Sequence, residues 1–453
     1  MSDHIGPIST SIGEFEAAAA HADVHTVELA APDTQGHLRG KRIPAKRFFD
    51  SGYKSGANIA DAMFVFDIQN DLPENEFVNM DTGYLDAHLT PDTTTGRILT
   101  HRPGYALMFA DATNEHGDPH PLAPRSVLAA QVERCREAGL NPVVATELEF
   151  FLCNPDWTPV QDHIQYSSVT DGFEFEAALA DMRAALLGAG IEVEGSNAEY
   201  GPGQFEINTG PADAMTAADN TVLFKSIVKQ VAVQHGYRAS FMPKPWADQS
   251  GSGMHVHTSL NVDGKNAFAK CNDGEPSELM SNWLGGLLEH AAAMTLLGAP
   301  NSNGLKRIRP YTFAPTHVCW GLDNRTVLAR CIAESGSGAN RVEFRSPGAD
   351  ANAYVVIAAI LAAGMDGIER KLDPGAMSEG DVYGNPGDLT ALATDLAGAI
   401  AAFSGSELAT RLGDTFSRSF VSIAEGEIPL AAENNPDPDD VNDWERERFI
   451  EHS

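Results

Sequence analysis

Residues 251–260 read GSGMHVHTSL, a glycine-rich turn followed by a stretch in which polar and apolar side chains alternate. Because successive side chains of a strand point to opposite faces, His255, His257 and Ser259 are predicted to share one face. The opposite face would carry Met254, Val256, Thr258 and Leu260. Such a strand has an apolar back and a polar front that is suited to a metal ion or a phosphate. Two histidines on a solvated face are the alternative, because an isolated His-x-His pattern is a weak motif.

Charged residues recur with the same spacing on two other strand-like segments. Residues 143–152 read VVATELEFFL, so Glu147 and Glu149 are predicted to lie on one face, opposite three apolar residues. Residues 341–345 read RVEFR, and on a strand Arg341, Glu343 and Arg345 would share a face in the same way. Both segments therefore combine an apolar back with a charged front.

A turn is predicted to bring two further glutamates together. In residues 199–207, EYGPGQFEI, the Gly-Pro-Gly segment would return the chain so that Glu199 approaches Glu206. Neighbouring carboxylates repel each other unless a cation lies between them. Five glutamates with His255 offer oxygen ligands and one imidazole, a set that suits Mg²⁺ or Mn²⁺ and does not suit structural zinc. A solvated sheet face would explain any one pair, but four such segments favour a metal site.

Positive charge is concentrated in one part of an otherwise acidic chain. Residues 307–345 contain Arg307, Arg325, Arg330, Arg341 and Arg345. A guanidinium group binds carboxylates and phosphates through two parallel hydrogen bonds, so this cluster predicts an anionic ligand beside the metals. Surface salt bridges are the alternative. Divalent metals with several arginines are what phosphoryl transfer requires, because that reaction depends on positioning and charge neutralisation.

The overall composition is that of an acidic globular protein. The 453 residues include 63 Asp and Glu against 31 Lys and Arg, which gives a formal net charge of −32. No basic stripe is available to displace counterions from phosphates, so nucleic acid and anionic membranes are not expected as partners. The first residues lack a signal-peptide pattern, and the five widely spaced cysteines form no CxxC pair. These features predict a cytoplasmic protein without a membrane anchor.

The order of the predicted elements indicates an α+β chain with two domains. An N-terminal sheet domain is expected over residues 1–115, and turn-forming residues at 114–124 mark its boundary with a second domain over residues 116–453. Strands are expected at 26–29, 37–43, 62–68, 87–90, 97–100, 106–110, 143–152, 204–208, 239–242, 255–260, 327–331 and 341–345. Helices are expected at 10–21, 126–139, 174–189, 212–236, 278–297, 351–371 and 388–412, and residues 432–443 should form a loop before a last short helix.

Six segments occur in the order found in glutamine synthetases of the class I type, and the chain resembles that family from about residue 27 to its C-terminal region. They read TELEFF, AEYGPGQFEI, FMPKPWADQSGSGMHVHTSL, NGLKRIRP, DNRTVLAR and NRVEFRSPGADANAY. As a set these motifs are highly specific. The resemblance implies a β-grasp-like N-terminal domain and a catalytic domain built on an antiparallel half-barrel sheet. It also implies a homo-oligomer, expected to be a dodecamer of two hexameric rings with active sites shared between neighbours.

The resemblance further implies roles for individual residues. The ligands of a first metal would be Glu149, Glu199 and Glu206, and those of a second metal Glu147, His255 and Glu343. Contacts to ATP are implied for His257, Ser259, Arg325, Arg330 and Arg341, and contacts to glutamate for Gly251, Arg307 and Arg345. The implied reaction transfers the γ-phosphoryl group of ATP to the side-chain carboxylate of glutamate, and an amine then attacks the acyl phosphate. Arg325 is expected to stabilise the phosphoryl transition state.

The chain departs from this family in two places that handle ammonium. The flap of glutamine synthetases carries a glutamate just before Ala-Pro, whereas residues 309–315 read RPYTFAP and have Phe313 there. A phenyl ring cannot accept a proton, although its face attracts a cation weakly. The family's N-terminal Asp-Gly-Ser-Ser segment is also missing. The nearest stretch, residues 65–71 (VFDIQND), offers Asp67 or Asp71 as a substitute base.

An altered ammonium pocket beside intact ATP, metal and glutamate residues predicts a different nucleophile. The segments WGLDNRT and DTGYLDAHLTPD also resemble the branch of glutamine-synthetase-like enzymes that γ-glutamylates organic amines such as polyamines, ethanolamine or alkylamines. The sequence is therefore interpreted as a glutamate-amine ligase. The alternatives are a glutamine synthetase with an unusual flap and an inactive protein that kept the fold. The complete set of metal-ligand residues argues against inactivity, because a scaffold has no need of like charges packed together.

Overall fold

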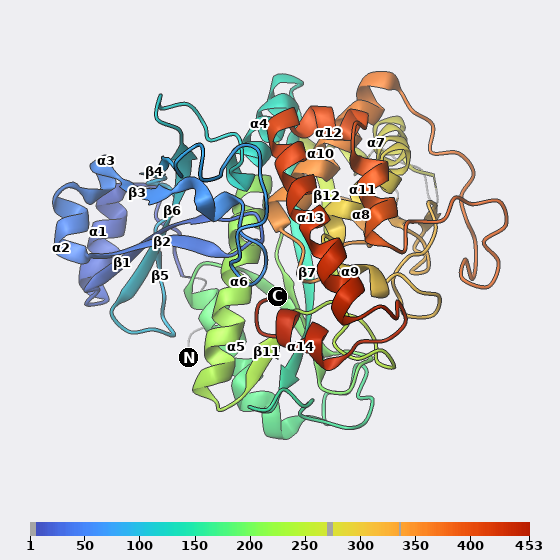
Figure 1. Cartoon of the computed structure of the whole chain (residues 1–453), viewed down its shortest axis with the longest axis horizontal. Coiled ribbons are helices and arrows are strands. Elements are labelled where there is room, and N and C mark those ends of the chain that lie inside the picture. Colours follow the sequence, from blue (N-terminus) through green and yellow to red (C-terminus); the bar gives the residue numbers. More distant parts are fainter. Residues whose placement is uncertain (1–5, 270–274, 335–336) are drawn as a thin grey trace.

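Two β-sheets organise the chain in the computed structural model, which describes residues 6–269, 275–334 and 337–453 (Figure 1). The smaller sheet belongs to the N-terminal part, at the left of Figure 1, and has the strand order β2-β1-β6-β4-β3, with β5 beside β6. Its strands are β1 (Thr26–Pro32), β2 (Leu38–Pro44), β3 (Ala57–Ala60), β4 (Asp86–Pro91), β5 (Arg97–Ile98) and β6 (Tyr105–Thr113). Helix α1 (Ile12–His21) and the short helices α2 (Ala45–Arg47) and α3 (Tyr53–Ser55) lie beside it. Strands β1 and β6 pair in parallel, and the other pairs are antiparallel.

The N-terminal sheet has an apolar core of its own. Phe15 of α1 packs edge-to-face against Phe48, with ring centroids 6.2 Å apart, and both side chains are fully buried. The same core includes Leu122 and Ala123, which lie beyond residue 115. The structure thus defines a mixed α/β fold with two sheets, while the division after residue 115 and the β-grasp-like form stay predictions.

The larger sheet carries most of the polar residues that the sequence singled out. Its main path runs β14-β15-β16-β12-β7-β9-β8, with three short strands paired to β7 and β12. Along the path lie β14 (Trp320–Leu322), β15 (Ala329–Ile332), β16 (Arg341–Phe344), β12 (Met254–Val262), β7 (Asn141–Cys153), β9 (Gln204–Thr209) and β8 (Val193–Ala198). The short strands are β10 (Ala212–Asp213), β11 (Arg238–Ser240) and β13 (Lys265–Asn266). All described pairs in this sheet are antiparallel except β14 with β15.

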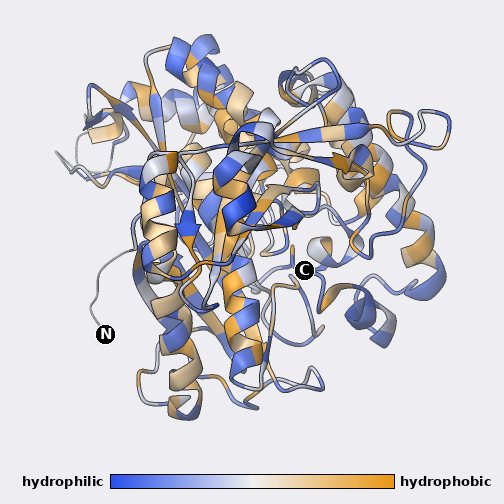
Figure 2. Ribbon diagram, turned by 90° about the vertical axis from the view of Figure 1, so that its left-hand side faces the viewer, coloured by the Kyte–Doolittle hydropathy of each residue, from blue (hydrophilic) through white to orange (hydrophobic). Residues whose placement is uncertain are grey.

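Helices pack against one side of the larger sheet and against each other. Helix α10 is buried along most of its length and contacts α4, α6, α7 and α8, and α6 also packs on β7. The helices are α4 (Pro124–Glu137), α5 (Glu176–Gly188), α6 (Ala214–Gln234), α7 (Glu278–Glu289), α8 (Ala291–Gly298), α9 (Ser302–Lys306), α10 (Ala353–Arg370), α11 (Leu396–Phe403), α12 (Glu407–Leu412), α13 (Asp414–Asn434) and α14 (Asp443–Phe449). Most carry both apolar and hydrophilic residues, as helices that cover a core do (Figure 2).

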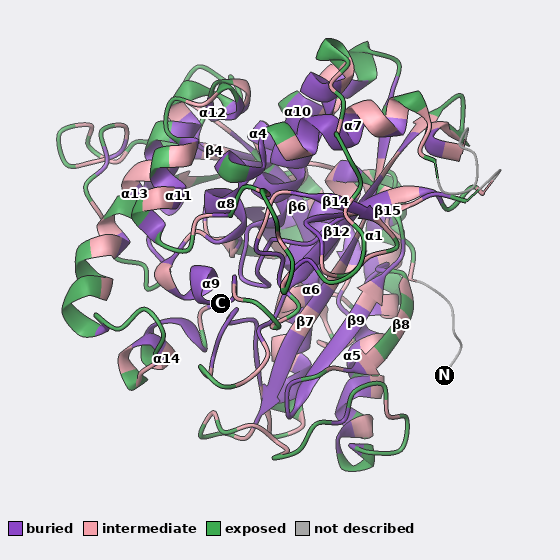
Figure 3. Ribbon diagram, turned by 90° about the vertical axis from the view of Figure 1, so that its right-hand side faces the viewer, coloured by how far each residue is buried: buried purple, intermediate pink, exposed green. Residues whose placement is uncertain are grey.

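Strand β7 lies between β12 and β9 and determines which face of the sheet is polar. Leu148, Phe150 and Leu152 are fully buried in the main apolar core. Figure 3 shows β7 and β9 as long buried strands, while exposed residues gather in the outer loops and helix ends. The alternation predicted for residues 143–152 therefore holds, since burying one face of a strand sends the intervening side chains to the other face.

Two predicted elements differ from the structure in their type or continuity. Residues 62–68 were expected to form a strand, but a 3₁₀ helix over Asp61–Phe64 occupies the start of this segment. The helix expected over residues 278–297 is divided into α7 and α8 at His290, whose buried imidazole Nε2 lies 2.8 Å from Asp366 Oδ2 of α10. The first prediction is wrong, and the second is right except for the break.

The C-terminal helices also depart from the prediction. The single helix expected over residues 388–412 is two helices, α11 and α12. Gly405 has a φ of +68°, which ends the first, and the side chain of Ser406 caps the second. Helix α13 was not predicted, and it contains Pro429. The loop expected over residues 432–443 begins three residues later, after Asn434, and precedes α14.

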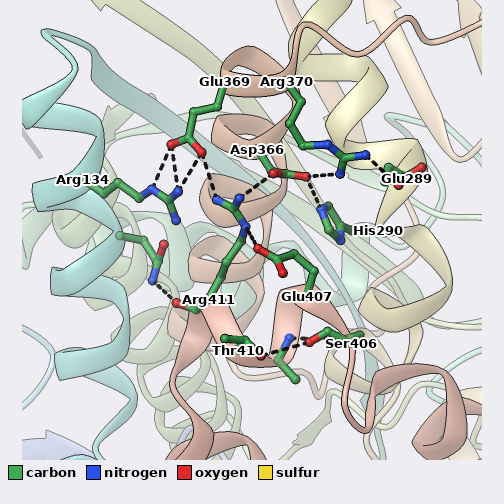
Figure 4. A network of polar contacts seen from close by, with 12 residues as sticks. Arg134, Glu289, His290, Asp366, Glu369, Arg370, Ser406, Glu407, Thr410 and Arg411 are labelled. Carbon is green, nitrogen blue, oxygen red and sulfur yellow. Dashed lines mark hydrogen bonds and ion pairs between the residues drawn. The ribbon is translucent and has the colours of Figure 1, made fainter.

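A network of charged side chains ties four helices together (Figure 4). Asp366 of α10, whose side chain is fully buried, accepts hydrogen bonds from Arg370 at 2.8 Å and from Arg411 of α12 at 2.5 Å. His290 reaches the same carboxylate, and Arg134 of α4 is paired with Glu369 at 2.8 Å. A buried carboxylate with this many donors is fully satisfied, so the network locks the helix ends in register.

The cysteines and the composition of the helices bear on the environment in which the protein works. Cys135, Cys153, Cys319 and Cys331 are buried and form no disulfide with one another, whereas Cys271 lies outside the described residues. Across residues 6–269, 275–334 and 337–453, no helix has both the length and the apolar composition that a bilayer span needs.

A second buried network joins the N-terminal sheet to the larger part of the chain. Arg125 of α4, with only 4% of its side chain exposed, donates to Asp92 at 2.8 Å and is also bonded to Asp111 of β6. It reaches Asp219 of α6 at 3.3 Å, and Tyr354 of α10 donates to the same carboxylate. One guanidinium therefore compensates carboxylates from both parts of the fold.

We expect Arg125→Met to lower the free energy of unfolding by about 3–5 kcal/mol, because Asp219 would keep a buried charge without its main cation. Urea denaturation followed by circular dichroism measures this change. Arg136→Met is the matched control on the same helix, since Arg136 forms an exposed ion pair with Glu133, and it should leave the midpoint unchanged. Equal losses for both variants would contradict the role given to Arg125.

Candidate active site

The polar face of the larger sheet lines a cavity of about 850 Å³. The predicted site residues found in its wall are Glu147, Glu149, Glu199, Glu206, Gly251, His255, Arg307, Phe313, Arg325, Arg330, Glu343 and Arg345. They come from strands β7, β9, β12, β15 and β16, from the turn before β12, and from the segments that follow β8, α9, β14 and β16. The fold thus brings together both predicted ligand sets, the residues expected at glutamate and the flap residue Phe313.

Strand register brings the carboxylates together. Glu149 of β7 is paired with Glu206 of β9, and Glu147 of β7 is paired with His255 of β12. Side chains on directly paired residues have Cβ atoms about 5 Å apart. The Gly-Pro-Gly turn closes with a 2.8 Å hydrogen bond from the amide of Glu199 to the carbonyl of Gln204. The predicted shared faces and the predicted return of Glu199 are both confirmed.

Two groups of potential metal ligands meet at His255, and the ligand atoms of each group lie within 4.8 Å of one another. One group consists of Glu147, Glu343 and His255, and the Nδ1 atom of His255 lies 3.5 Å from a carboxylate oxygen of each glutamate. The other joins Glu149 and Glu206 to His255, whose Nε2 lies 3.9 Å from Glu149. This buried Nε2 has no hydrogen-bond partner among the described residues. Clustered carboxylates with an unpartnered imidazole nitrogen fit a hard divalent cation.

Burial and mutual repulsion disfavour ionisation of three carboxyl groups in the cluster. Burial and the neighbouring Glu199 raise the pKa of Glu149 to about 8. Burial and Glu206 raise the pKa of Glu199 to about 7, and burial and Glu149 raise the pKa of Glu206 to about 8. Carboxylates packed in this way all become ionised only if a cation neutralises them.

Two other carboxylates are held in the ionised form. Burial opposes ionisation of Glu147, but His255 and His257 outweigh it and lower its pKa well below the usual range. Nε2 of His257 lies 3.0 Å from Oε1 of Glu147. Burial is also overcome at Glu343, where Arg345 and then His255 lower the pKa to about 2. Glu147 and Glu343 are therefore anionic, whereas Glu149, Glu199 and Glu206 resist ionisation.

The glycine turn before β12 makes room for Arg307. A Cβ atom on Gly251 would lie 2.7 Å from the carbonyl oxygen of Pro243 and 2.8 Å from Cγ of Arg307. Arg307 is buried and donates to the carbonyl of Ser346 at 2.8 Å. The amide of Gly253 donates to Glu149 Oε2 at 2.8 Å. The turn thus seats an arginine against the carboxylate cluster, and any larger residue at Gly251 would displace it.

The arginines of the cavity differ in how much they are already engaged. Arg345 is paired with Glu343, and Arg330 donates to Glu343 Oε2 at 2.9 Å. Arg330 was predicted around ATP phosphates, yet it lies in the same cavity as the residues expected at glutamate. Arg325 is exposed at the cavity wall and makes no hydrogen bond to any residue that the structure describes. Arg325 is therefore the guanidinium that is available to an incoming anion.

A second cavity of about 420 Å³ adjoins the first and shares Glu147 and Asn208 with it. It contains the other predicted ATP contacts, His257, Ser259 and Arg341. Nε of Arg341 donates to Nδ1 of His257 at 3.1 Å. The predicted nucleotide residues are therefore divided between two adjoining cavities, with Glu147 at their junction.

Asp67 lies away from both cavities of its own chain. Its Oδ1 accepts hydrogen bonds from the amides of Gln69 and Asp71 at 2.9 and 2.8 Å, and Arg448 of α14 donates to its Oδ2 at 2.8 Å. Asp67 is buried, while Asp71 is exposed. Within one chain Asp67 therefore closes a loop and anchors α14. The catalytic role predicted for Asp67 is at the active site of an adjacent subunit, because the resemblance implies sites shared between neighbours.

Several residues of the cavity were not identified from the sequence. Tyr383 lies in its wall, and its buried hydroxyl has no hydrogen-bond partner among the described residues. Burial raises the pKa of Tyr383, although nearby arginines oppose this. Gln204 links Glu149 to the carbonyl of Gly251 through its side-chain amide, at 3.3 and 3.1 Å. For Gln204 the sequence offered one signal, its position in the EYGPGQFEI segment. Tyr383 offered none, because it lies in a loop without periodicity.

The chain belongs to the glutamine synthetase family, because the family model described as glutamine synthetase, catalytic domain, matches residues 121–448. It is an ATP-dependent carbon–nitrogen ligase by this membership and by the ligases among its relatives. A glutamate–isopropylamine ligase from a Pseudomonas species is 35% identical, and the alignment covers 95% of both chains. A γ-glutamylethanolamide synthetase from Streptomyces coelicolor is 34% identical over 100% of this chain and 97% of its own.

A solved structure and a glutamine synthetase are also similar to the chain. The solved structure of GmaS in complex with ADP superposes with a TM-score of 0.83, 29% identity and coverage of 96% of this chain and 98% of that chain. A glutamine synthetase from Thermus thermophilus is 39% identical, over 66% of this chain and 70% of its own. The amine ligases from Pseudomonas and Streptomyces match over 95% or more of both chains, which supports the γ-glutamylamine synthetase branch.

We expect divalent metal to stabilise the protein more at high pH than at low pH. The raised carboxyl pKa values mean that the folded state holds protons that the unfolded state has lost, between the ordinary value of 4.5 and about 8. Stability without metal therefore falls as pH rises through this window, and Mg²⁺ or Mn²⁺ should restore it. Thermal unfolding in EDTA and in excess metal, from pH 5.5 to 8.5, measures both trends. A metal-induced shift that is independent of pH would contradict this assignment.

We expect Glu206→Gln to separate stability from metal binding. Removing one buried carboxylate relieves repulsion, so the melting temperature in EDTA should rise or stay the same, whereas the shift caused by Mg²⁺ should be largely lost. Glu16→Gln, an exposed change on α1, is the control and should alter neither quantity. If Glu206→Gln kept the full metal-induced shift, Glu206 would not be a ligand.

Proposed function

We propose that this protein joins glutamate to an organic amine, with ATP as co-substrate, through a γ-glutamyl phosphate. The observation that carries this proposal is one cavity that holds the complete carboxylate cluster with Arg307, Arg325, Arg330 and Arg345, and whose flap has Phe313 where glutamine synthetases have a glutamate. The γ-phosphoryl group would pass to a side-chain oxygen of glutamate and leave ADP. The amine nitrogen would then attack the acyl carbon, expel phosphate and lose a proton.

The carboxylate cluster around His255 is proposed to hold two ions of Mg²⁺ or Mn²⁺. One ion would be bound by Glu149, Glu199 and Glu206, and the other by Glu147, His255 and Glu343. In the structure the ligand atoms of Glu149 and Glu206 group with His255, so Glu199 would have to move toward them when the ion binds. Bound metals would supply charge neutralisation for the phosphoryl group in transfer. The raised pKa values of Glu149, Glu199 and Glu206 support this assignment, since a cluster that resists ionisation gains most from a cation.

The cationic residues of the cavity are proposed to divide the substrates between them. Arg307 and Arg345, with the turn at Gly251, would hold the carboxylates of glutamate. Arg325 would reach the phosphoryl group in the transition state. It makes no hydrogen bond to another described residue, which supports this role because no such contact has to be broken first. The second cavity, with His257, Ser259 and Arg341, would take the remaining part of ATP. The ADP complex of the similar GmaS structure supports nucleotide binding by this fold.

An organic amine is the proposed nucleophile because the flap offers a ring instead of a carboxylate. Ammonium has no apolar part, so Phe313 could contribute little to its binding beyond a weak cation–π attraction. An amine with an organic substituent would bury that substituent against the ring. The names of two relatives that match over 95% or more of both chains, a glutamate–isopropylamine ligase and a γ-glutamylethanolamide synthetase, support this choice.

The cellular setting and the assembly belong to the same proposal. We expect a cytoplasmic homo-oligomer, a dodecamer of two hexameric rings, that acts in amine or polyamine metabolism. Asp67 would then approach the site of an adjacent subunit, although its bonds to Arg448 and to two amides would first have to be replaced.

We expect organic amines to be used at least ten-fold more efficiently than ammonium, measured as kcat/KM from ADP release with glutamate and ATP, with mass spectrometry of the product. Phe313→Glu should lower the ratio of kcat/KM for organic amines to kcat/KM for ammonium, or reverse the preference, since a carboxylate in the flap favours the ammonium ion. Phe313→Leu is the control for size and should keep the preference. Ammonium turnover by the wild type that equals turnover with every amine would overturn the proposed function.

A further inference from the structure

Three aromatic side chains form a half-exposed arc on one side of the cavity. The rings of Tyr200 and Phe313 meet edge-to-face with centroids 5.2 Å apart, and Tyr166 lies 6.3 Å from Tyr200 in the same manner. All three line the cavity, and between 44% and 57% of each residue remains exposed. We call Tyr166, Tyr200 and Phe313 the aromatic arc. Rings left open to solvent inside a polar cavity mark a surface that a ligand can cover.

The flap presents Phe313 in an unusual backbone conformation. Phe313 has a φ of +63° and Tyr311 a φ of +62°, a left-handed region that bulky residues seldom occupy. The hydroxyl of Thr312 lies 2.8 Å from the carbonyl oxygens of both Arg307 and Arg309, which ties the loop to its own base. Strained residues at a cavity wall are retained where their side chains must take a particular direction. The flap therefore directs the ring of Phe313 onto that of Tyr200.

The arc stands directly beside the carboxylate cluster. Tyr200 follows Glu199 in the chain, and the amide of Tyr200 donates to Glu199 Oε2 at 3.2 Å. An amine nitrogen at the edge of the carboxylate cluster would therefore have its substituent against the rings. Ring faces attract an alkylammonium ion, and burial there also favours the neutral amine that can attack an acyl phosphate.

We propose that the aromatic arc selects the nucleophile as a primary monoamine with a compact apolar substituent, such as a short branched alkyl group, with Tyr200 and Phe313 as the residues that determine specificity. This inference rests on the proposed function and narrows its amine. The arc offers no carboxylate to a second ammonium group of a diamine. Asp381 also lines the cavity, but each of its carboxylate oxygens already accepts a hydrogen bond, one from the amide of Tyr383 at 2.9 Å and the other from the hydroxyl of Tyr311 at 3.4 Å.

The first experiment measures kcat and KM of the wild-type enzyme for ammonium, isopropylamine, ethanolamine and putrescine, with glutamate and Mg-ATP at saturation. We expect kcat/KM for isopropylamine to exceed that for ethanolamine and for putrescine by about ten-fold or more. Burial against the rings gains more hydrophobic free energy for an isopropyl group than for a hydroxyethyl group or a chain that ends in a second ammonium, because the latter two lose solvation of a polar group. Ethanolamine or putrescine used as well as isopropylamine would overturn the specificity inference and leave the proposed function intact. Ammonium used best of all would overturn the proposed function itself.

The second experiment tests the two rings by substitution. Tyr200→Leu and Phe313→Leu keep apolar bulk and should keep the preference for isopropylamine over ethanolamine. Tyr200→Gln and Phe313→Gln are of similar size but polar, and should raise KM for isopropylamine roughly ten-fold while KM for glutamate stays unchanged. Both side chains are half exposed, so these changes open no core cavity. A wild-type amine preference in both Gln variants would overturn the inference.

Phe173→Ala is the matched control, since Phe173 is 80% exposed and is absent from the cavity wall. It should leave every kinetic constant at the wild-type value. Circular dichroism and the thermal shift caused by Mg-ATP check that each variant is folded. A change in amine preference in Phe173→Ala as large as in Phe313→Gln would show that the effect does not come from the arc and would overturn the inference.

Discussion

Repulsion between carboxylates on one face of the larger sheet is the constraint on which the rest of the structure depends. Glu149 and Glu206 oppose each other across β7 and β9, and Glu199 is brought beside them by a tight turn. The strand register cannot relax without breaking the sheet, so these groups resist ionisation. Nearby cations must therefore offset the repulsion, and both the ligand chemistry and the arginines of the cavity follow from this need.

The apolar side of the same sheet keeps the cluster rigid. Alternate residues of β7 are fully buried beneath the helices, and α10 is enclosed on almost every side. Charged networks around Asp366 and around Arg125 then tie the helices to one another and to the N-terminal sheet. Close packing of this kind leaves little room for strand movement, so the carboxylates held by β7 and β9 keep their separation when charge enters the cavity.

The cavity combines two chemical environments. One part is formed by the carboxylates and arginines around His255, and the part next to it is formed by the aromatic rings of Tyr166, Tyr200 and Phe313. Exchange of a flap carboxylate for a ring removes a proton acceptor and adds apolar surface in a single step. In a ligase of this family, the same scaffold can thereby keep its phosphoryl chemistry while its nucleophile changes.

Much of the candidate site could be predicted because it rests on local alternation. Strand parity placed Glu147 with Glu149 and His255 with His257, and each pair does share a face, since burial of the apolar side leaves no other orientation. Helix breaks were harder to foresee: His290 interrupts a helix through a partner in α10, and Gly405 ends one by its positive φ. Neither interruption leaves a periodic signal in the chain.

The sequence by itself determined the composition of the site: which carboxylates, histidines and arginines are present, and that the flap carries a ring. Only the tertiary structure decided which of them meet. Arg330 lies with the residues expected at glutamate, Tyr200 packs on Phe313, and Asp67 is bonded to Arg448 away from the cavity. The physical reason is that periodicity fixes the direction of a side chain relative to its own strand. Contacts between distant segments depend on strand order and loop paths, which no local pattern encodes.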